Sequence, residues 1–228
     1  MNGSDIAPLI DHTLLKADAT DAGIRRLCEE AKEFGFHSVC VNPFFVPLAR
    51  DLVAGSGVNV TTVVGFPLGA NATKGKIYEA LESSLAGAKE LDIVMNLGMA
   101  KAGQWDAAEK DISDVISATK GLVHKVIIET CYLSKEEKKR ASEVILHAGA
   151  EFVKTSTGMG PSGADVEDIL LIRTVVGDRC GIKAAGGIRS LAQVREFIAA
   201  GATRIGTSAG VAIMEELRGM EKDIKRYQ

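Results

Sequence analysis

The chain has 228 residues, of which 46% are hydrophobic and 25% charged, and its formal net charge is −3. These fractions are typical of globular proteins and exclude a disordered, collagen-like or disulfide-rich chain, and the charge gives little attraction for nucleic acid or anionic membranes. The sequence contains no apolar run of membrane-spanning length, and its first residues lack the basic and apolar regions of a signal peptide. We therefore expect a cytoplasmic protein without nucleic-acid or membrane partners.

The potential metal ligands are scattered. The four cysteines form no C-x-x-C motif and have no histidine pair nearby, and the four histidines include no H-x-x-x-H spacing. These spacings argue against a zinc site and against a thioredoxin-type redox motif. We expect reduced, buried thiols, and we assign neither a metal nor a cofactor.

Short β-branched runs alternate with amphipathic stretches along the whole chain. Strands are expected at residues 9–13, 38–42, 58–65, 91–96, 123–129, 152–156, 181–185 and 204–207. Four stretches between them have apolar residues at helical spacing: Ile24, Leu27, Ala31 and Phe34; Ile77, Leu81, Leu85 and Ala88; Trp105, Ala108, Ile112 and Val115; and Leu191, Val194, Phe197 and Ile198. Eight strands at about 28 residues per unit predict an α/β fold, a single-domain TIM (β/α)8 barrel over residues 1–228.

Helix boundaries are also marked. Ser134 and Ser190 are each followed three residues later by Glu137 and Gln193, a pattern typical of capping boxes. Glycines at positions where helices should end are Gly87, Gly149 and Gly201.

A repeated pattern marks the even-numbered strands. Each follows a glycine, and the fifth residue after that glycine interrupts the apolar character of the strand: Cys40, Asp92, Lys154 and Gly206. The interior of a TIM barrel is filled by layers of four side chains drawn from alternate strands. We infer that these four residues form one interior layer. Because an interior charge is costly unless it is paired, the carboxylate and ammonium in this layer indicate function.

Lys154 is the first candidate catalytic residue. A lysine that faces inward from mid-strand is desolvated, which lowers its pKa and favours the neutral amine that attacks carbonyls. The alternative is a lysine on the outer surface, which is disfavoured because helices cover the outside of such a barrel.

Lys183 and Asp92 complete the candidate catalytic set. Lys183 lies in the neighbouring strand, and two ammonium groups at ~4 Å repel by ~4 kcal/mol at an effective dielectric of ~20. One of the two lysines should therefore be neutral near pH 7, unless Lys183 only binds a substrate anion. Asp92 can balance charge and exchange protons, and a purely structural pairing with a lysine is the competing interpretation.

Glycine-rich loops follow the last strands. In TIM barrels, a phosphate often sits on the loops after strands seven and eight, held by backbone N–H groups at a helix N-terminus. The run Gly-Gly-Ile-Arg-Ser at 186–190 and the run Gly-Thr-Ser-Ala-Gly at 206–210 occupy those positions, and residues 155–158 could add donors. The candidate phosphate-binding residues are Gly158, Gly186, Gly187, Arg189, Gly206 and Ser208.

Nearly the whole chain resembles the deoxyribose-phosphate aldolases, which are class I aldolases on a TIM barrel. The resemblance rests on residues 11–15, 39–43, 64–69, 91–96, 126–130, 153–158, 183–189 and 204–208. The Lys-Thr-Ser-Thr-Gly run that begins at Lys154 and the Lys-Ala-Ala-Gly-Gly run that begins at Lys183 are its most specific parts. The resemblance implies that Lys154 forms the Schiff base, that Lys183 perturbs its pKa and assists proton transfer, and that Asp92 relays protons through water.

The resemblance also implies an activity. The expected reaction is the reversible cleavage of 2-deoxy-D-ribose 5-phosphate to D-glyceraldehyde 3-phosphate and acetaldehyde, in deoxyribose phosphate catabolism, without metal or cofactor and in a homodimer. Another Schiff-base TIM-barrel aldolase that acts on a different phosphosugar is the main alternative. A phosphosugar isomerase or synthase without an imine, and a non-catalytic binding barrel, are the others.

Two positions depart from the family pattern. Some members place a phosphate-contacting lysine directly after the Lys-Thr-Ser-Thr-Gly run, where this chain has Met159. Phosphate affinity is therefore expected to depend more on Arg189 and on backbone amides. Some members also use a terminal tyrosine on a mobile tail for proton transfer, and the position of Tyr227 soon after the last expected helix puts that role in doubt.

Overall fold

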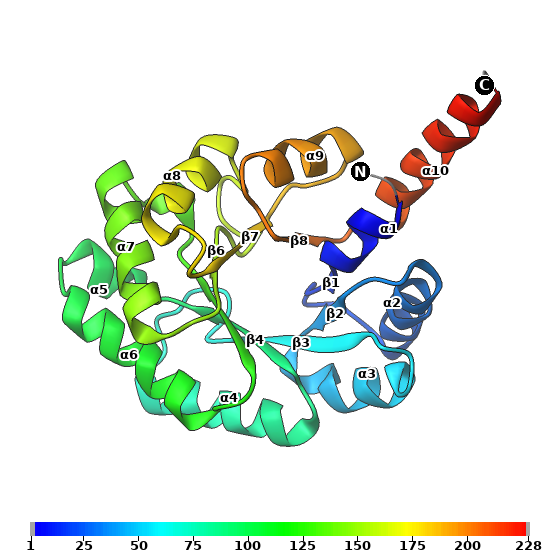
Figure 1. Cartoon of the computed structure of the whole chain (residues 1–228). Helices are drawn as coiled ribbons and strands as arrows, with labels where there is room; N and C mark the ends of the chain where they lie inside the picture. The colour runs from blue at the N-terminus through cyan, green and yellow to red at the C-terminus, as the bar shows by residue number, and fades with distance from the viewer. Residues whose placement is uncertain (1–2, 227–228) are drawn as a thin grey trace.

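Eight strands form a closed parallel barrel in the computed structural model, which describes residues 3–226. They pair in chain order, and β1 closes the barrel against β8 (Figure 1). The strands are β1 (Ile10–Leu14), β2 (Ser38–Val41), β3 (Asn59–Val64), β4 (Glu90–Val94), β5 (Val123–Ile127), β6 (Phe152–Lys154), β7 (Gly181–Ala185) and β8 (Arg204–Thr207). The predicted TIM barrel is confirmed, and β7 and β8 span the predicted residues. Tyr227 lies outside the described residues.

Helices connect the strands and surround the barrel (Figure 1). They are α1 (Gly3–Ile6), α2 (Asp21–Phe34), α3 (Val46–Val53), α4 (Thr73–Ala86), α5 (Leu97–Lys101), α6 (Trp105–Ala118), α7 (Lys135–Ala148), α8 (Val166–Val176), α9 (Leu191–Ala199) and α10 (Gly210–Arg226). Three short 3₁₀ helices are η1 (Ala7–Leu9), η2 (Pro43–Phe45) and η3 (Thr130–Tyr132). Within residues 3–226, no helix combines the length and apolar character needed to cross a membrane.

Most of the predicted helix boundaries are confirmed. Both capping boxes form, at Ser134 on α7 and at Ser190 on α9. Gly87 and Gly149 end α4 and α7 in the left-handed region, where glycine carries no steric penalty. The C-cap of α9 is Ala200, which has a right-handed conformation, and Gly201 follows it with a positive φ.

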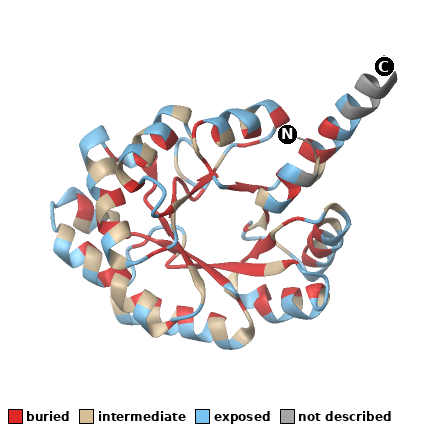
Figure 2. Ribbon diagram, viewed as in Figure 1, coloured by how far each residue is buried: buried red, intermediate tan, exposed pale blue. Residues whose placement is uncertain are grey.

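The hydrophobic core lies between the barrel and its helices. Outward-facing strand residues such as Val39, Ile93 and Ile182 are fully buried there against the apolar faces of the helices. Figure 2 shows the strands almost entirely buried, and the solvent-facing sides of the helices exposed. Most of the apolar strand residues pack outside the barrel wall, and the interior combines charged and polar side chains with a few apolar ones such as Cys40 and Val63.

The predicted buried face of α4 is wrong in part: Ile77 packs against the core and Ala88 is buried, but two of its leucines are not. Leu81 is 38% exposed and Leu85 is 80% exposed, whereas Lys76, Ala80 and Ser83 are buried. The orientation follows from one ion pair, because Lys76 Nζ lies 2.7 Å from Asp111 Oδ2 on α6. An unpaired buried ammonium would be costly, so the pair determines which face of α4 turns inward. The apolar faces predicted for α2, α6 and α9 are buried largely as expected.

Candidate active site

The strand register places the even-strand residues at one height in the barrel. Lys154 pairs with Lys183, Asp92 with Lys125, and Asp11 with Gly206. In an eight-stranded barrel of this type the strands tilt, so residues at one height advance by one position from each strand to the next. When the pairings are followed around the barrel with this offset, Cys40, Asp92, Lys154 and Gly206 lie at the same height. The predicted interior layer is confirmed.

Two further layers lie toward the N-terminal ends of the strands. The next layer comes from the odd-numbered strands and consists of Asp11, Thr61, Lys125 and Lys183. The layer beyond it consists of Ser38, Glu90, Phe152 and Arg204. Sequence reasoning missed four charged members of these layers: Asp11, Glu90, Lys125 and Arg204. The alternation of inward and outward residues was the available signal, because Glu90 stands two residues before Asp92 on the same strand.

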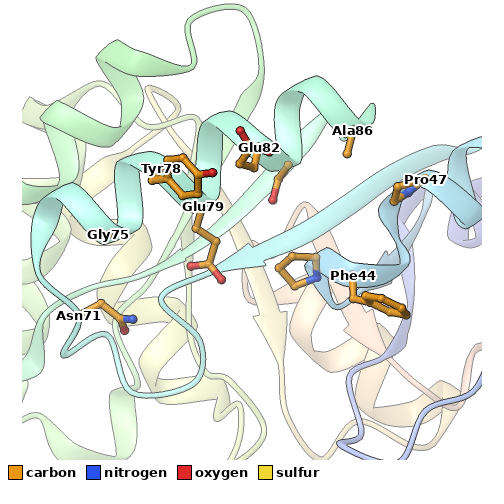
Figure 3. Close-up of a pocket in the computed structure, with 10 residues that line it drawn as sticks. Phe44, Pro47, Asn71, Gly75, Tyr78, Glu79, Glu82 and Ala86 are labelled. Atoms are coloured by element: carbon orange, nitrogen blue, oxygen red, sulfur yellow. The ribbon is translucent and has the colours of Figure 1, made fainter.

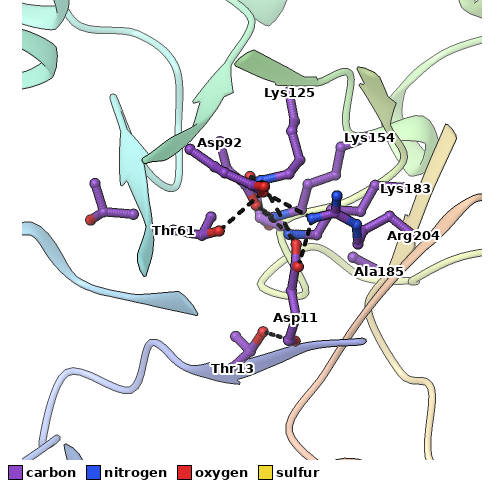
Figure 4. Close-up of polar contacts among 12 residues, drawn as sticks. Asp11, Thr13, Thr61, Asp92, Lys125, Lys154, Lys183, Ala185 and Arg204 are labelled. Atoms are coloured by element: carbon purple, nitrogen blue, oxygen red, sulfur yellow. Dashed lines mark hydrogen bonds and ion pairs between the residues drawn. The ribbon is translucent and has the colours of Figure 1, made fainter. Parts of the chain in front are cut away.

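Three lysines share the carboxylate of Asp92 (Figure 4). The Nζ atoms of Lys154 and Lys183 each lie 2.7 Å from its Oδ2, and Nζ of Lys125 donates to its Oδ1 at 2.9 Å. Lys154 and Lys183 are at most 4% exposed, and Asp92 is fully buried. The structure therefore brings together the three predicted catalytic residues, with Asp92 bridging the two candidate lysines.

Asp11 occupies the other side of Lys183. Its Oδ2 lies 2.5 Å from Lys183 Nζ, and its Oδ1 accepts hydrogen bonds from Arg204 at 3.0 Å and from Ser38 at 2.8 Å (Figure 4). Lys183 is thus held between two carboxylates, whereas Lys154 has only Asp92. This asymmetry distinguishes the two lysines chemically.

The electrostatic environment separates their proton affinities. Burial lowers the pKa of Lys154, and the attraction of Asp92 only partly offsets the combined effect of burial and Lys183. Burial also disfavours the ammonium of Lys183, but Asp11 and Asp92 outweigh that effect and raise its pKa. The pKa of Asp92 stays well below its ordinary value because the three lysines overcome the penalty of burial. The site therefore combines an amine inclined to be neutral with a protonated lysine and an ionised carboxylate.

A cavity of about 240 Å³ opens over these groups at the C-terminal ends of the strands. Lys154 reaches it, and every predicted phosphate-binding residue lines it: Gly158, Gly186, Gly187, Arg189, Gly206 and Ser208. Sequence reasoning missed Thr13, near the end of β1, and Lys16, in the loop that follows, which also line it. Met159 lies on the rim and is 55% exposed. The cavity therefore combines a reactive amine with a glycine-rich rim at the position where TIM barrels place their active sites.

Two of these glycines are required by close approach. A Cβ on Gly186 would come within 2.9 Å of the Gly163 Cα, and its φ of 92° lies in the left-handed region. A Cβ on Gly206 would lie 3.0 Å from Lys183 Cε, inside the barrel. Gly206 therefore makes room for a lysine as well as lining the cavity.

Glu129 fixes the loop that follows β6. Its backbone φ is 48°, the only positive value at a non-glycine position among the described residues, and its side chain is 3% exposed. The backbone N–H of Thr157 donates to Glu129 Oε1 at 3.2 Å, and the Thr157 hydroxyl donates to Oε2. A strained backbone kept beside a substrate-sized cavity is characteristic of functional sites.

A larger hollow, about 530 Å³, lies outside the barrel between α3 and α4 (Figure 3). Its lining includes Phe44, Tyr78, Glu79 and Glu82, and contains no lysine, arginine or histidine. It therefore offers neither an amine nucleophile nor a cation for an anionic substrate, and the cavity over Lys154 is the better candidate for the active site.

A third cluster gathers groups of metal-ligand type that are far apart in the sequence. One ligand atom each from Asp11, His37 and Glu90 lies within 4.8 Å of the others. Arg204 Nη1 lies 3.0 Å from Asp11 and 2.9 Å from Glu90, and Lys125 Nζ lies 2.6 Å from Glu90. A guanidinium and an ammonium already pair with these carboxylates. The acidic groups of the cluster are therefore explained as partners of Arg204 and Lys125, without a metal ion.

Known proteins match the chain over nearly its whole length. Residues 6–216 match the DeoC/LacD family of aldolases. A deoxyribose-phosphate aldolase of Caldanaerobacter subterraneus subsp. tengcongensis is 55% identical over 93% of each chain. Among solved structures, the aldolase QR15 has a TM-score of 0.91 at 42% identity and covers 95% of this chain and 97% of its own. A tetrameric deoxyribose phosphate aldolase of Aeropyrum pernix has a TM-score of 0.90 at 33% identity, over 96% and 93%.

Proposed function

Because the chain belongs to the DeoC/LacD family of aldolases, we infer that its reaction is that of its deoxyribose-phosphate aldolase relatives. It is a class I aldolase that reversibly cleaves 2-deoxy-D-ribose 5-phosphate to D-glyceraldehyde 3-phosphate and acetaldehyde. The observation that carries this conclusion in the structure is the pair of lysines on one carboxylate beneath the cavity: the pKa of Lys154 is lowered and that of Lys183 is raised. The assignment of roles to individual residues is our proposal.

Lys154 is the nucleophile. Its neutral amine attacks the C1 aldehyde of the open-chain sugar and forms a carbinolamine, whose hydroxyl leaves as water to give an iminium. Lys183 supplies the proton to this leaving hydroxyl: its raised pKa keeps it protonated, and it meets Lys154 at the same Asp92 oxygen. Asp92 passes protons between the two lysines and, through water, to the substrate.

The iminium then draws electrons from the C2–C3 bond. As that bond breaks, the C3 hydroxyl loses its proton and becomes the aldehyde of glyceraldehyde 3-phosphate, while the electron pair forms an enamine on Lys154. Protonation of the enamine at C2 and addition of water to the iminium release acetaldehyde and return the free amine. In this scheme the protonated imine performs the polarisation for which other aldolases use a Lewis acid.

The phosphate-binding residues follow from the cavity. Arg189 lies on the rim beside Gly186 and Gly187, which precede α9, and Ser208 precedes α10. Backbone N–H groups at helix N-termini favour an anion, so these two loops are suited to bind the substrate phosphate. With Met159 at the rim, the cationic side chains that line the cavity besides Lys154 are Lys16 and Arg189.

The assembly we propose is a homodimer, and the location we propose is the cytoplasm. Apolar side chains are exposed around α3 and α4: Phe44 is 82%, Tyr78 67% and Leu85 80% exposed. Figure 3 shows Phe44 and Tyr78 at this surface. Exposed apolar groups of this kind mark association surfaces in many proteins. Sedimentation equilibrium tests the proposal: Phe44→Ser should shift the protein toward monomer, and a wild-type monomer would contradict it.

Cleavage of 2-deoxyribose 5-phosphate tests the proposed function. Glyceraldehyde 3-phosphate released by the wild type is measured with a coupled dehydrogenase, with and without a chelator. We expect release at the same rate in both conditions and none from Lys154→Leu. As the matched control, Lys138→Leu removes a lysine whose ion pair with Asp168 lies between α7 and α8, and it should retain activity. Activity in Lys154→Leu would contradict the assignment of the nucleophile.

A further inference from the structure

The barrel interior contains an odd number of charges. Four lysine and arginine side chains and three carboxylates are connected by ion pairs inside the barrel in the described structure: Lys125, Lys154, Lys183 and Arg204 with Asp11, Glu90 and Asp92. His37, which is 26% exposed, pairs with Glu90 from the solvent side and is not counted among these seven. If all seven were ionised, the interior would hold one uncompensated positive charge. Because an uncompensated charge in a buried site is expensive, the balance favours one neutral cation partner.

Lys125 lies at the centre of this network although it does not line the cavity. Its Nζ lies 2.6 Å from Glu90 Oε2, 2.9 Å from Asp92 Oδ1 and 3.7 Å from Asp11 Oδ2, and its side chain is fully buried. By occupying Oδ1 of Asp92, it leaves Oδ2 to face Lys154 and Lys183. Lys125 therefore determines both the orientation of Asp92 and how much of its negative charge remains for Lys154.

We propose that Lys125 is a positioning residue for the reaction, and that Lys125 and Glu90 together set the proton affinity of Lys154 by fixing the charge balance of the barrel interior. The cationic side chains of Lys125, Lys183 and Arg204 match the three carboxylates in number, so the balance disfavours a proton on the fourth cation, Lys154. This inference rests on the proposed role of Lys154 as nucleophile. According to this proposal, Lys154 becomes the reactive amine because of groups that lie below the catalytic layer and do not touch substrate.

The environment of each group agrees with this selection. Lys154 contacts one carboxylate, while Lys183 contacts two and Arg204 contacts two. Among the charges that hold the pKa of Asp92 low against burial, Lys125 has the largest effect. Cys40 also faces Lys154, but burial raises the pKa of its thiol to about 11, so it stays neutral and outside the balance.

The network reaches solvent at its far end. His37 Nε2 lies 2.6 Å from Glu90 Oε1, and the His37 side chain is 26% exposed. Thr61 and Ser38 contribute hydroxyl groups to the same carboxylates without adding charge. Lys125 and Glu90, of opposite charge and away from the cavity lining, are therefore suited to test the balance without changing a group placed in contact with substrate.

Removing charges of opposite sign tests the proposal. Lys125→Met removes a positive charge, so Lys154 should hold its proton more strongly. One carboxylate bridges the two ammonium groups, which puts them roughly 5 Å apart, and at an effective dielectric of ~20 the expected rise is roughly 2 pH units. Glu90→Gln removes a more distant negative charge and should lower the same midpoint by roughly 1 unit. The pH midpoint of Lys154 in the double variant should lie between the midpoints of the two single variants.

The readout is the pH at which Lys154 becomes reactive. Each variant is incubated with acetaldehyde and cyanoborohydride across the pH range, and the rate of N-ethylation at Lys154 is followed by peptide mass spectrometry. Lys76→Met is the matched control, because Lys76 is as fully buried and pairs with Asp111 outside the barrel wall. It should lose stability while shifting the midpoint by less than about half a unit.

The outcomes distinguish the two proposals. Modification of Lys183 or Lys125, with Lys154 left unmodified, would contradict the proposed nucleophile itself. Modification at Lys154 with midpoints that move in opposite directions supports the charge balance. Midpoints that stay within half a unit of wild type, or move in the same direction in both single variants, overturn it. If Lys125→Met does not fold, Glu90→Gln and the double variant still decide the sign.

Discussion

Replacing Gly206 with alanine adds a single methyl group inside the barrel. The new Cβ would lie 3.0 Å from Lys183 Cε and 3.1 Å from Ala185 Cβ. Gly206 does not lie in the left-handed region of backbone conformation, so alanine introduces no backbone strain there. The effect of Gly206→Ala is therefore steric, and the side chain that must move is Lys183.

The size of this effect follows from the packing. Inserting a methyl group into a filled interior typically costs about 1–3 kcal/mol, because neighbouring side chains leave their preferred positions. Lys183 Nζ is held 2.7 Å from Asp92 Oδ2, and displacing it weakens the contact that supports proton transfer. If a similar free energy is lost from the transition state, kcat/KM falls roughly 5- to 160-fold.

Urea denaturation and the cleavage assay measure the two effects. We expect Gly206→Ala to unfold at lower urea concentration and to show reduced kcat. Gly75→Ala is the matched control, because nothing lies within 4 Å of the added methyl group and the residue is in helix α4. That variant should be as active as wild type and equally stable or slightly more so. Wild-type kcat and stability in Gly206→Ala would refute the claim that the position of Lys183 matters.

Two further predictions concern charge. Burial raises the pKa of Glu90, but His37 and Lys125 outweigh it and hold the pKa at about 2, below the ordinary 4.5. Its stabilising contribution, about 3 kcal/mol, is therefore complete above pH ~4.5 and lost as the pH falls toward 2. Urea titrations at pH 7 and pH 3 should show a smaller loss of stability in Glu90→Gln than in wild type, and equal losses would contradict this. Met159→Lys adds a cation at the cavity rim and should lower KM for 2-deoxyribose 5-phosphate by about 2- to 5-fold, without changing KM for 2-deoxyribose; equal changes for both sugars would contradict a phosphate contact.

The catalytic layer was predictable from the sequence because its pattern is local. Asp92 and Lys154 each follow a helix-ending glycine by five residues, and this spacing can be read from the sequence without knowledge of the tertiary contacts. Because neighbouring strands of a TIM barrel are offset by a constant step, equal spacing from the glycine places both residues at one height in the barrel. Lys183 was predicted because it lies in the strand expected next to that of Lys154, and the structure pairs the two residues directly.

The charged groups below that layer were not predicted. Asp11, Lys125 and Arg204 come from strands that lack the marking glycine phase or from positions deeper in the strand. Their contact depends on the closure of β1 against β8, which no local pattern records. The buried face of α4 was missed for a similar reason, since a single long-range ion pair between Lys76 and Asp111 outweighs its apolar periodicity.

The central claim is that Lys154 forms a covalent imine because it is the interior lysine whose pKa is lowered. The most direct measurement is borohydride reduction of the enzyme in the presence of acetaldehyde at pH 7, followed by peptide mapping of the modified lysine. The account predicts one N-ethyl group per chain, on Lys154, and none on Lys183 or Lys125. Modification of Lys183 in place of Lys154, or no modification in an enzyme that still cleaves 2-deoxyribose 5-phosphate, would contradict it.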